Sequence, residues 1–329
     1  MSLRKSLRRT FLPLLGRLGL VTDAERKTLL AIRRSVNTNG TALYNLLHCM
    51  PLLEYMVESV GQTLQDKHVL EIGTTNPPGL PLALLLDGCA KFYGNNILDV
   101  GNRLPMEYAE VVNIMLSRLA GVDPMRIRQI LDCETHNGEQ VAVLRKEVFE
   151  ALPQCPAEQL SLPDASIDMA FSVSVMEHLE NTREVLDNLH RMLRPGGWSF
   201  HLIDLRDHSD FSKPLEFLKY DRAEYQRIGG SFQNRLRAGD FVALFEESGY
   251  RIERVGYMTQ PPGVINSSTT DLFDMGSMSI ADMYQYTSID SLDQHIDDSL
   301  FASFHPDFQA KSRQELSVMG MCIICQRPD

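Results

Sequence analysis

Residues 162–178 read LPDASIDMAFSVSVMEH and residues 194–205 read RPGGWSFHLIDL, and this stretch decides the fold. The short apolar runs at 167–172 and 198–205 are bounded by turn residues, which is typical of buried strands. Between them, residues 181–193 carry apolar side chains at the helical period and end at a Pro-Gly-Gly turn that cannot continue a helix. Strand, helix and strand in this order predict a βαβ unit of an open α/β sheet, which binds ligands at the carboxyl ends of its strands.

A second strand and turn lie upstream, where residues 68–79 read HVLEIGTTNPPG ahead of an apolar helix expected at 80–86. At these residues and at 162–205 the chain resembles the class I S-adenosylmethionine (SAM)-dependent methyltransferases. The family commonly carries a Leu-Pro-x-x-Asp-x-x-x-Asp strand, where this chain reads Leu-Pro-Asp-Ala-Ser-Ile-Asp at 162–168. The chain shares the Glu-His pair at the end of that strand and the Arg-x-Leu-x-Pro-Gly-Gly turn. The resemblance implies an α/β fold with a Rossmann-like seven-stranded sheet, an N-terminal helical cap and an insertion before the last strand.

The domain organisation follows from this resemblance. Residues 1–60 have a largely helical pattern and form the expected cap, and residues 61–329 form the expected SAM-binding domain. Within it, residues 107–119 and 124–131 are predicted helices. The third strand of the sheet is expected between residues 141 and 155.

The end of the chain is expected to form the antiparallel hairpin that closes the family's sheet, with strands at 251–258 and 318–325. The segment 260–314 between these strands is polar and acidic, and it is predicted to be a solvated insertion. A long insertion at this position would overhang the active site as a lid, or would serve as an oligomer contact.

SAM is the cofactor that the resemblance implies, and its methionine end is expected at the turn after residues 68–72. Glycine there lets the backbone approach a ligand closely. The family turn usually has three glycines, whereas this chain has Thr75 and Pro77 at the second and third positions, so a plain strand-to-helix turn stays an alternative. The candidate cofactor-binding residues are Glu71, Gly73, Thr74, Gly79, Asn96, Asp99, Ala157, Glu158 and Ser172.

The second strand, expected at 91–97, should end in an acid that accepts hydrogen bonds from the ribose hydroxyls. Asn96 is at the aligned position, where its carbonyl can accept one such bond, and Asp99 follows three residues later. The alternative is that Asn96 belongs to an ordinary turn after the strand. Ala157 and Glu158 fall where the family's loop lies along the adenine.

Ionisable residues crowd the end of the strand at 198–205. If the acceptor is a hydroxyl, the protein must align it with the methyl group and remove its proton. His208, oriented by Asp204 or Asp207, is the predicted base, and His178 is a second candidate whose alternative role is to close the cofactor pocket. Three arginines could bind an anionic acceptor or form internal ion pairs, and both options stay open for Arg206, Arg235 and Arg237.

Residues 203–208 (Ile-Asp-Leu-Arg-Asp-His) and 234–237 (Asn-Arg-Leu-Arg) resemble methyltransferases of bacterial surface-glycan and secondary-metabolite pathways. This likeness implies O-methylation of a sugar or another small polar acceptor, so the expected partner is a small-molecule or glycan acceptor. One alternative is N-, S- or C-methylation of a small metabolite or lipid. A further alternative is a non-catalytic SAM-fold protein that binds a partner.

Composition narrows the function classes. The chain has 329 residues, 43% of them hydrophobic, and no apolar run long enough to span a bilayer, so a globular cytoplasmic protein is expected. Its six cysteines are scattered, which favours reduced thiols. Cys322 and Cys325 have metal-site spacing but lie in an apolar run without a second ligand pair, so no metal site is expected.

Charge is distributed unevenly along the chain. The net charge is −11, whereas residues 1–21 contain five basic residues and no acid. The acidic remainder argues against nucleic acid as a substrate, because phosphate-rich ligands are normally met by a basic surface. The basic N-terminus has leucines at helical spacing, and it can be a peripheral membrane contact, a mitochondrial targeting segment or a helix packed on the protein. The oligomeric state stays open.

Overall fold

The computed structural model describes residues 50–76, 78–98, 100–106, 126–230, 233–259, 263–266 and 286–329. The chain divides into two compact units, residues 1–156 and 157–329, and each is described by itself. The basic N-terminus, the helix predicted at 107–119 and Asp99 lie outside the described residues, as does much of the predicted insertion. No helix in the described part of the chain is long and apolar enough to cross a membrane.

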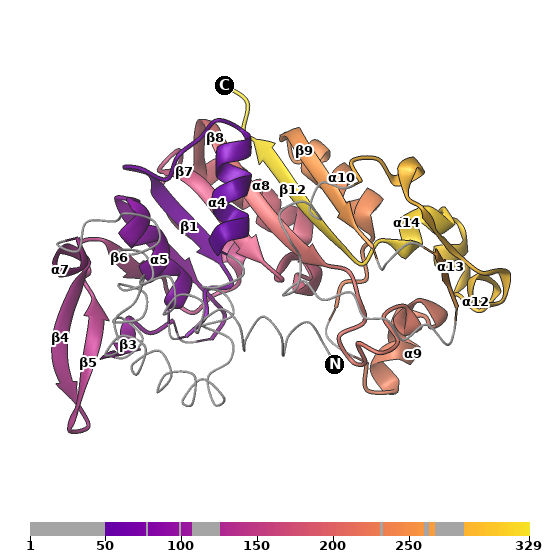
Figure 1. The fold of residues 1–329 in the computed structure, drawn as a ribbon, viewed down its shortest axis with the longest axis horizontal. Helices are drawn as coiled ribbons and strands as arrows, with labels where there is room; N and C mark the ends of the chain where they lie inside the picture. The colour runs from indigo at the N-terminus through magenta and orange to yellow at the C-terminus, as the bar shows by residue number, and fades with distance from the viewer. Residues whose placement is uncertain are drawn as a thin grey trace, which may run out of the picture. The chain divides into compact units, whose positions relative to one another are not determined.

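The main sheet has seven strands in the order β6-β2-β1-β7-β8-β12-β9 (Figure 1). Strands β1, β2 and β6 run parallel, as do β7 and β8, whereas β12 runs antiparallel to both β8 and β9. The predicted Rossmann-like class I sheet and its closing antiparallel hairpin are therefore confirmed. The strands are β1 (His68–Ile72), β2 (Lys91–Asn95), β6 (Phe149–Ala151), β7 (Ile167–Val173), β8 (Leu193–Asp204), β9 (Arg251–Met258) and β12 (Gly320–Gln326).

In the first unit, helix α5 (Gly79–Asp87) follows β1 and is buried from Gly79 to Leu86, which explains its almost continuous apolar sequence. Helix α4 (Met50–Ser59) packs against α5. The strand expected between residues 141 and 155 is β6, whose Phe149 pairs with Phe92 of β2.

A separate three-stranded sheet in this unit was not predicted. It contains β3 (Arg103–Pro105), β4 (Leu131–His136) and β5 (Glu139–Leu144), in the order β3-β5-β4 (Figure 1). The helix predicted at 124–131 is wrong at its end, because α7 (Ile127–Ile130) stops and the chain continues directly into β4. Asn137 and Gly138 join β4 to β5 with positive φ angles of 51° and 83°, the geometry of a tight hairpin turn.

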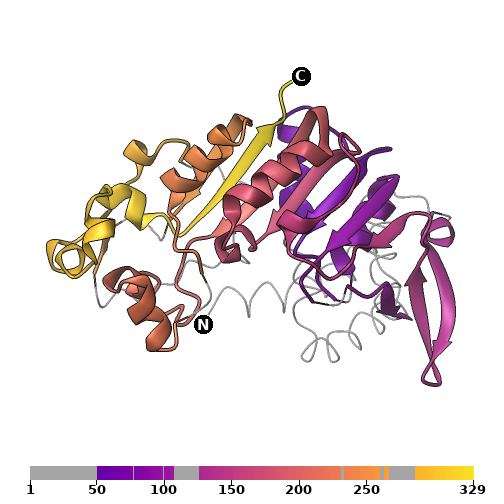
Figure 2. The same ribbon diagram turned by 180° about the vertical axis from the view of Figure 1, so that it is seen from behind.

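The second unit is built on β7, β8, β12 and β9. Helices α8 (Thr182–Met192) and α10 (Ala238–Glu247) pack against each other and against these strands (Figure 2). The apolar stripe of α8 is fully buried, and β8 is buried from Trp198 to Asp204, so both ends of the predicted βαβ unit are anchored in one core.

The described part of the insertion is not simply solvated, so that prediction is wrong there. Its elements are β10 (Gly263–Ile265), β11 (Gln294–Ile296), α12 (Asp298–Ala302), α13 (Pro306–Gln309) and α14 (Arg313–Ser317). Strands β10 and β11 pair in parallel. Apolar side chains spaced along the acidic sequence turn inward, and the buried ones include Leu292, Ile296, Leu300, Phe304 and Phe308. These residues recur at every fourth position among largely polar ones, so no continuous apolar run marked this small core in the sequence.

Candidate active site

Glu71 lies near the carboxyl end of β1 and is 3% exposed. Its Oε2 atom has no hydrogen-bond partner. Burial raises the pKa of Glu71 to about 7, and a hydrogen bond from the Thr74 side chain opposes this rise only in part. A buried carboxyl oxygen without a partner is costly, so this position favours either a proton or a bound cation. The ammonium group of a SAM methionine moiety is such a cation.

The turn after β1 brings backbone donors to the same place. Gly73 has a φ of 87°, and the N–H groups of Gly73 and Thr74 both donate to the carbonyl of Asn95, at 2.8 and 2.9 Å. These bonds fasten the turn to the end of β2. Helix α5 then begins at Gly79 without a side-chain cap. An uncapped helix N-terminus attracts a carboxylate, so Glu71 and the start of α5 together suit the two charges of a methionine moiety.

Gly73→Ala should weaken SAM binding at least about tenfold, equal to about 1.4 kcal/mol, because a side chain enters the ligand's space. Its φ of 87° adds backbone strain, so the variant should also lose stability. Gly138→Ala is a matched control, since Gly138 has a φ of 83° with nothing near its added Cβ. Both variants should therefore unfold more easily, and only Gly73→Ala should bind SAM weakly in a calorimetric titration. Equal SAM affinities would remove Gly73 from the site.

Glu71 also predicts a pH dependence. Its pKa is about 7 in the folded chain and near 4.5 in an unfolded one, so between these values the folded chain holds a proton that the unfolded chain has lost. Stability should thus fall as pH rises from about 4.5 through about 7, by about 3 kcal/mol. Glu71→Gln should abolish this contribution, making the variant more stable than the wild type at about pH 8 in urea unfolding, while weakening SAM binding. If the stability of the wild type and of Glu71→Gln depended on pH in the same way, Glu71 would not be the group with the raised pKa.

Asn96, the predicted ribose contact, is engaged in local structure. Its Nδ2 donates to the Thr74 carbonyl at 2.9 Å, and its Oδ1 accepts from the Leu98 N–H at 3.0 Å. The bond from Leu98 is that of a turn after a strand, which was the alternative interpretation of Asn96, and the bond to Thr74 ties this turn to the one after β1. One lone pair of Oδ1 is left for a ligand, so a ribose contact from Asn96 stays a prediction.

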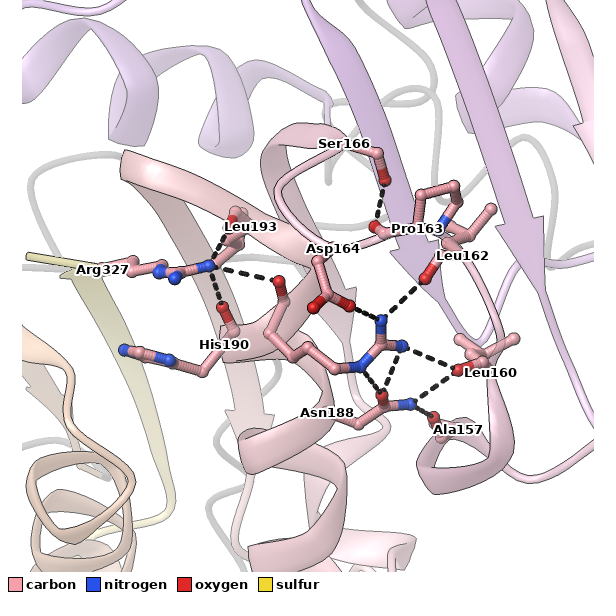
Figure 3. A network of polar contacts seen from close by, with 11 residues as sticks. Ala157, Leu160, Leu162, Pro163, Asp164, Ser166, Asn188, His190, Leu193 and Arg327 are labelled. Carbon is pink, nitrogen blue, oxygen red and sulfur yellow. Dashed lines mark hydrogen bonds and ion pairs between the residues drawn. The ribbon is translucent and has the colours of Figure 1, made fainter. Parts of the chain in front are cut away.

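The loop that contains Ala157 and Glu158 is held against α8 by backbone contacts (Figure 3). Asn188 donates to the carbonyls of Ala157 and Leu160 at 3.0 and 3.1 Å, and Arg191 donates to the Leu162 carbonyl at 2.9 Å. Glu158 accepts a hydrogen bond from Asn181. The loop is therefore well positioned, and its adenine contact remains a prediction.

Ser172 has an internal partner. It is fully buried in β7, and its hydroxyl lies 2.7 Å from Nδ1 of His201, whose Nε2 lies 2.6 Å from the Ser199 hydroxyl. Burial lowers the pKa of His201 to about 3, so this imidazole is neutral. The chain Ser172–His201–Ser199 joins β7 to β8, and a cofactor contact from Ser172 stays a prediction.

The predicted catalytic residues gather at the ends of β7 and β8. A short 3₁₀ turn (Met176–His178) follows β7, and it places His178 with its ring centroid 4.8 Å from that of His208. Nε2 of His208 lies 3.5 Å from Oδ2 of Asp204. Burial would raise the pKa of Asp204, but hydrogen bonds and charge from Arg206 and His208 lower it to about 2. Asp204 is therefore ionised beside His208.

The structure separates the two candidate partners of His208. Asp207 is 2% exposed, accepts a hydrogen bond from the Tyr225 hydroxyl and accepts another from the Ser209 N–H at 2.8 Å. Its carboxylate thus supports the loop after β8, and Asp204 is the acid that faces His208.

The three arginines donate to other groups of the chain, although Arg235 is only half-buried, and the alternative of an anionic acceptor stays open. Arg206 forms a two-point pair with Asp204, with bonds of 2.9 and 2.6 Å. Arg235 donates to the carbonyls of Phe217 and Tyr220. Arg237 is fully buried and donates to three carbonyls. Spacing alone could not show that backbone carbonyls, and not acids, are the main partners of Arg235 and Arg237.

A pocket opens beside this cluster in the second unit, and sequence patterns did not indicate it. It is narrow, with a volume of about 10 Å³, and its polar residues come from the turn after β7, from helix α9 (Arg222–Arg227) and from the segment before α10. The lining residues are His178, Glu180, Arg222, Tyr225, Gln226, Gln233, Asn234 and Arg235.

Comparison with known proteins gives one family match. Residues 111–201 match the family model described as "Methyltransferase domain". The matched range contains β7, α8, His178 and most of β8, while the turn at Gly73 lies outside it, so the cofactor residues in that turn rest on their geometry. No curated protein matches the chain.

Several solved structures are similar at low identity. A SAM-dependent methyltransferase from Mesorhizobium loti is 14% identical over 82% of this chain and 95% of its own, with a TM-score of 0.39. Phosphoethanolamine N-methyltransferase 2 from Haemonchus contortus, in complex with SAM, is 12% identical over 85% and 52% of the two chains, with a TM-score of 0.43. A SAM-dependent methyltransferase from Aquifex aeolicus is 17% identical over 62% and 82%, with a TM-score of 0.34. We draw no conclusion from likenesses at these TM-scores.

S-adenosylmethionine is the methyl donor that this family uses, and the buried, unpaired oxygen of Glu71 and the uncapped start of α5 fit its methionine end. The match of residues 111–201 to a methyltransferase domain, the sequence motifs and the seven-stranded sheet together support SAM-dependent methyltransferase activity on a sheet of the class I type.

Proposed function

We propose that the enzyme methylates a hydroxyl oxygen of a neutral, polar small acceptor such as a sugar. The observation that carries this proposal is the polar pocket that shares His178 with the His208–Asp204 cluster. A hydroxyl is a poor nucleophile until its proton is removed, so a hydroxyl acceptor needs a basic group at this place.

The charges around the pocket favour a neutral acceptor. Arg206 and Arg235 are occupied by internal partners, and Arg222, which lines the pocket, pairs with Glu180 at 3.0 Å. A phosphate or carboxylate on the acceptor would have to compete with these contacts. The carboxamides of Gln233 and Asn234 also line the pocket, and they are neutral donors and acceptors of the kind that bind the hydroxyl groups of a sugar.

An aromatic side chain adds an apolar surface near the same cluster. Phe211 is 43% exposed, and its ring centroid lies 5.3 Å from that of His208. Arg206 supports the ring, with its guanidinium carbon 4.5 Å from the centroid. The C–H face of a sugar ring packs well on such an exposed aromatic ring.

Bound SAM supplies an electrophilic methyl group and a sulfonium leaving group. In the proposed reaction His208 accepts the hydroxyl proton, while Asp204 stabilises the imidazolium that forms. The oxygen forms a bond to the methyl carbon as the carbon–sulfur bond breaks, and the products are a methyl ether and S-adenosylhomocysteine. His178 helps to position the acceptor from the pocket wall.

The test is methyl transfer from labelled SAM to a panel of neutral sugars and glycosides, with matched amines, thiols and phosphorylated sugars as competing acceptor classes. We expect label in a base-stable methyl ether of a neutral acceptor. Transfer only to an amine, a thiol or a carbon atom would overturn O-methylation. Transfer only to phosphorylated acceptors would overturn the preference for a neutral molecule. Saturable SAM binding without transfer to any class or to cell extract would favour the non-catalytic alternative.

A further inference from the structure

Glu177 is a buried acid at the end of β7 that the proposed reaction does not use. It is 2% exposed, and neither oxygen of its carboxyl group has a hydrogen-bond partner. One ligand atom each from Glu177, His178 and His208 lie within 4.8 Å of one another. We propose that these three residues form a binding site for one divalent transition-metal ion.

The surroundings of Glu177 make a cation favourable. Glu177 and Asp204 are both buried, and their charges act on each other. Arg206, the guanidinium whose charge also reaches Glu177, is already held by Asp204 through two bonds. Two acids therefore share one cation in a buried place, and a divalent ion would supply both the missing charge and the missing partner for Glu177.

The donor set indicates the class of metal. Two imidazoles and one carboxylate suit Zn²⁺, Co²⁺, Mn²⁺ or Fe²⁺, whereas Ca²⁺ and Mg²⁺ prefer oxygen ligands alone. Ligand atoms bound at about 2.0–2.2 Å from an ion must come somewhat closer together than 4.8 Å. His178 is exposed, so a rotation of its ring can close this gap without repacking the core.

The neighbouring groups resemble the outer shell of a metal site. Asp204 lies 3.5 Å from His208 Nε2 and is itself fixed by Arg206, an arrangement that orients a ligating imidazole. Three protein ligands leave a position for water or for an acceptor oxygen, and His178 also lines the pocket. No metal site was expected from the sequence, because the Cys322–Cys325 pair lacks a second ligand pair, and Glu177 and His208 are 31 residues apart in the chain.

A bound ion changes the role assigned to His208 under the proposed function. A nitrogen that ligates a metal cannot also accept a proton, so the base and ligand roles exclude each other at that atom. An ion with an acceptor hydroxyl in its open position would instead lower the pKa of that hydroxyl. Only this consequence rests on the proposed function, since metal binding can be measured without SAM or acceptor.

The test is calorimetric and spectroscopic titration of chelator-treated full-length protein with Co²⁺. We expect one Co²⁺ per chain and a visible spectrum without a thiolate charge-transfer band, because no cysteine belongs to the site. Glu177→Gln, His178→Ala and His208→Ala should each weaken binding at least about tenfold. His136→Ala is the matched control: His136 is exposed in β4, so its loss should leave Co²⁺ affinity unchanged.

Circular dichroism of each variant in chelator checks that its fold is retained. Absence of stoichiometric binding to the wild type would overturn the site, as would unchanged affinity in Glu177→Gln and His208→Ala. Once binding is shown, turnover with and without chelator separates the two roles of His208. Turnover that persists in chelator keeps His208 as the base, while turnover restored only by metal makes it a ligand. The metal-site proposal can therefore be contradicted while O-methylation is observed, and Co²⁺ binding can be observed while O-methylation is contradicted.

Discussion

His208→Ala should lower the turnover number by about a hundred- to ten-thousand-fold, the usual contribution of a general base. SAM affinity should stay nearly unchanged, because the groups that fit the methionine end, Glu71 and the start of α5, belong to the first unit and His208 belongs to the second. The physical reason is that an acceptor hydroxyl then has no imidazole, oriented by ionised Asp204, to take its proton. Single-turnover measurements should show the loss at the chemical step.

Two further variants test whether the lost turnover of His208→Ala is due to the loss of the catalytic base. His178→Ala should raise the Michaelis constant for the acceptor more than it lowers turnover, because His178 lines the pocket. His136→Ala should behave as the wild type. A His208 variant with normal turnover beside a dead His178 variant would reverse the two roles, and loss of SAM binding in His208→Ala would show that this residue supports the cofactor.

The strands of the main sheet could be predicted because their signal is local. The apolar runs at 167–172 and 198–205 are buried in the structure, and the Pro-Gly-Gly turn marks the point where α8 ends. The hairpin at Asn137-Gly138 had a local signal as well, since this dipeptide favours a tight turn. It was missed because β4 is exposed along most of its length, so no apolar alternation marks it as a strand.

Side-chain partners could not be predicted in the same way. The approach of His178 to His208 follows from the topology, because the carboxyl ends of neighbouring parallel strands meet at one edge of a sheet. The choice between Asp204 and Asp207 depends on Tyr225, which reaches Asp207 from helix α9. Nothing in the spacing of the two acids reveals that contact.

Arg237→Ala should destabilise the fold by about 3–5 kcal/mol, the largest stability effect that we expect from a single side chain. Arg237 is fully buried, and it donates to the carbonyls of Leu205 at 2.6 Å, Leu316 at 3.0 Å and Val318 at 2.5 Å. These carbonyls lie just after β8 and just before β12. Removing the guanidinium leaves three buried acceptors without this donor and creates a cavity beside Phe217.

Urea unfolding followed by circular dichroism measures the effect, and Arg237→Lys keeps the comparison possible if the alanine variant does not fold. Lysine restores the charge but not the planar set of donors, so its loss should be smaller and still clear. Arg251→Ala is the control, because Arg251 is 61% exposed and pairs with Glu253 at the surface, where such pairs contribute little. If Arg237→Ala unfolds within about 1 kcal/mol of the wild type, water must satisfy the three carbonyls, and Arg237 does not hold β8 to the segment before β12.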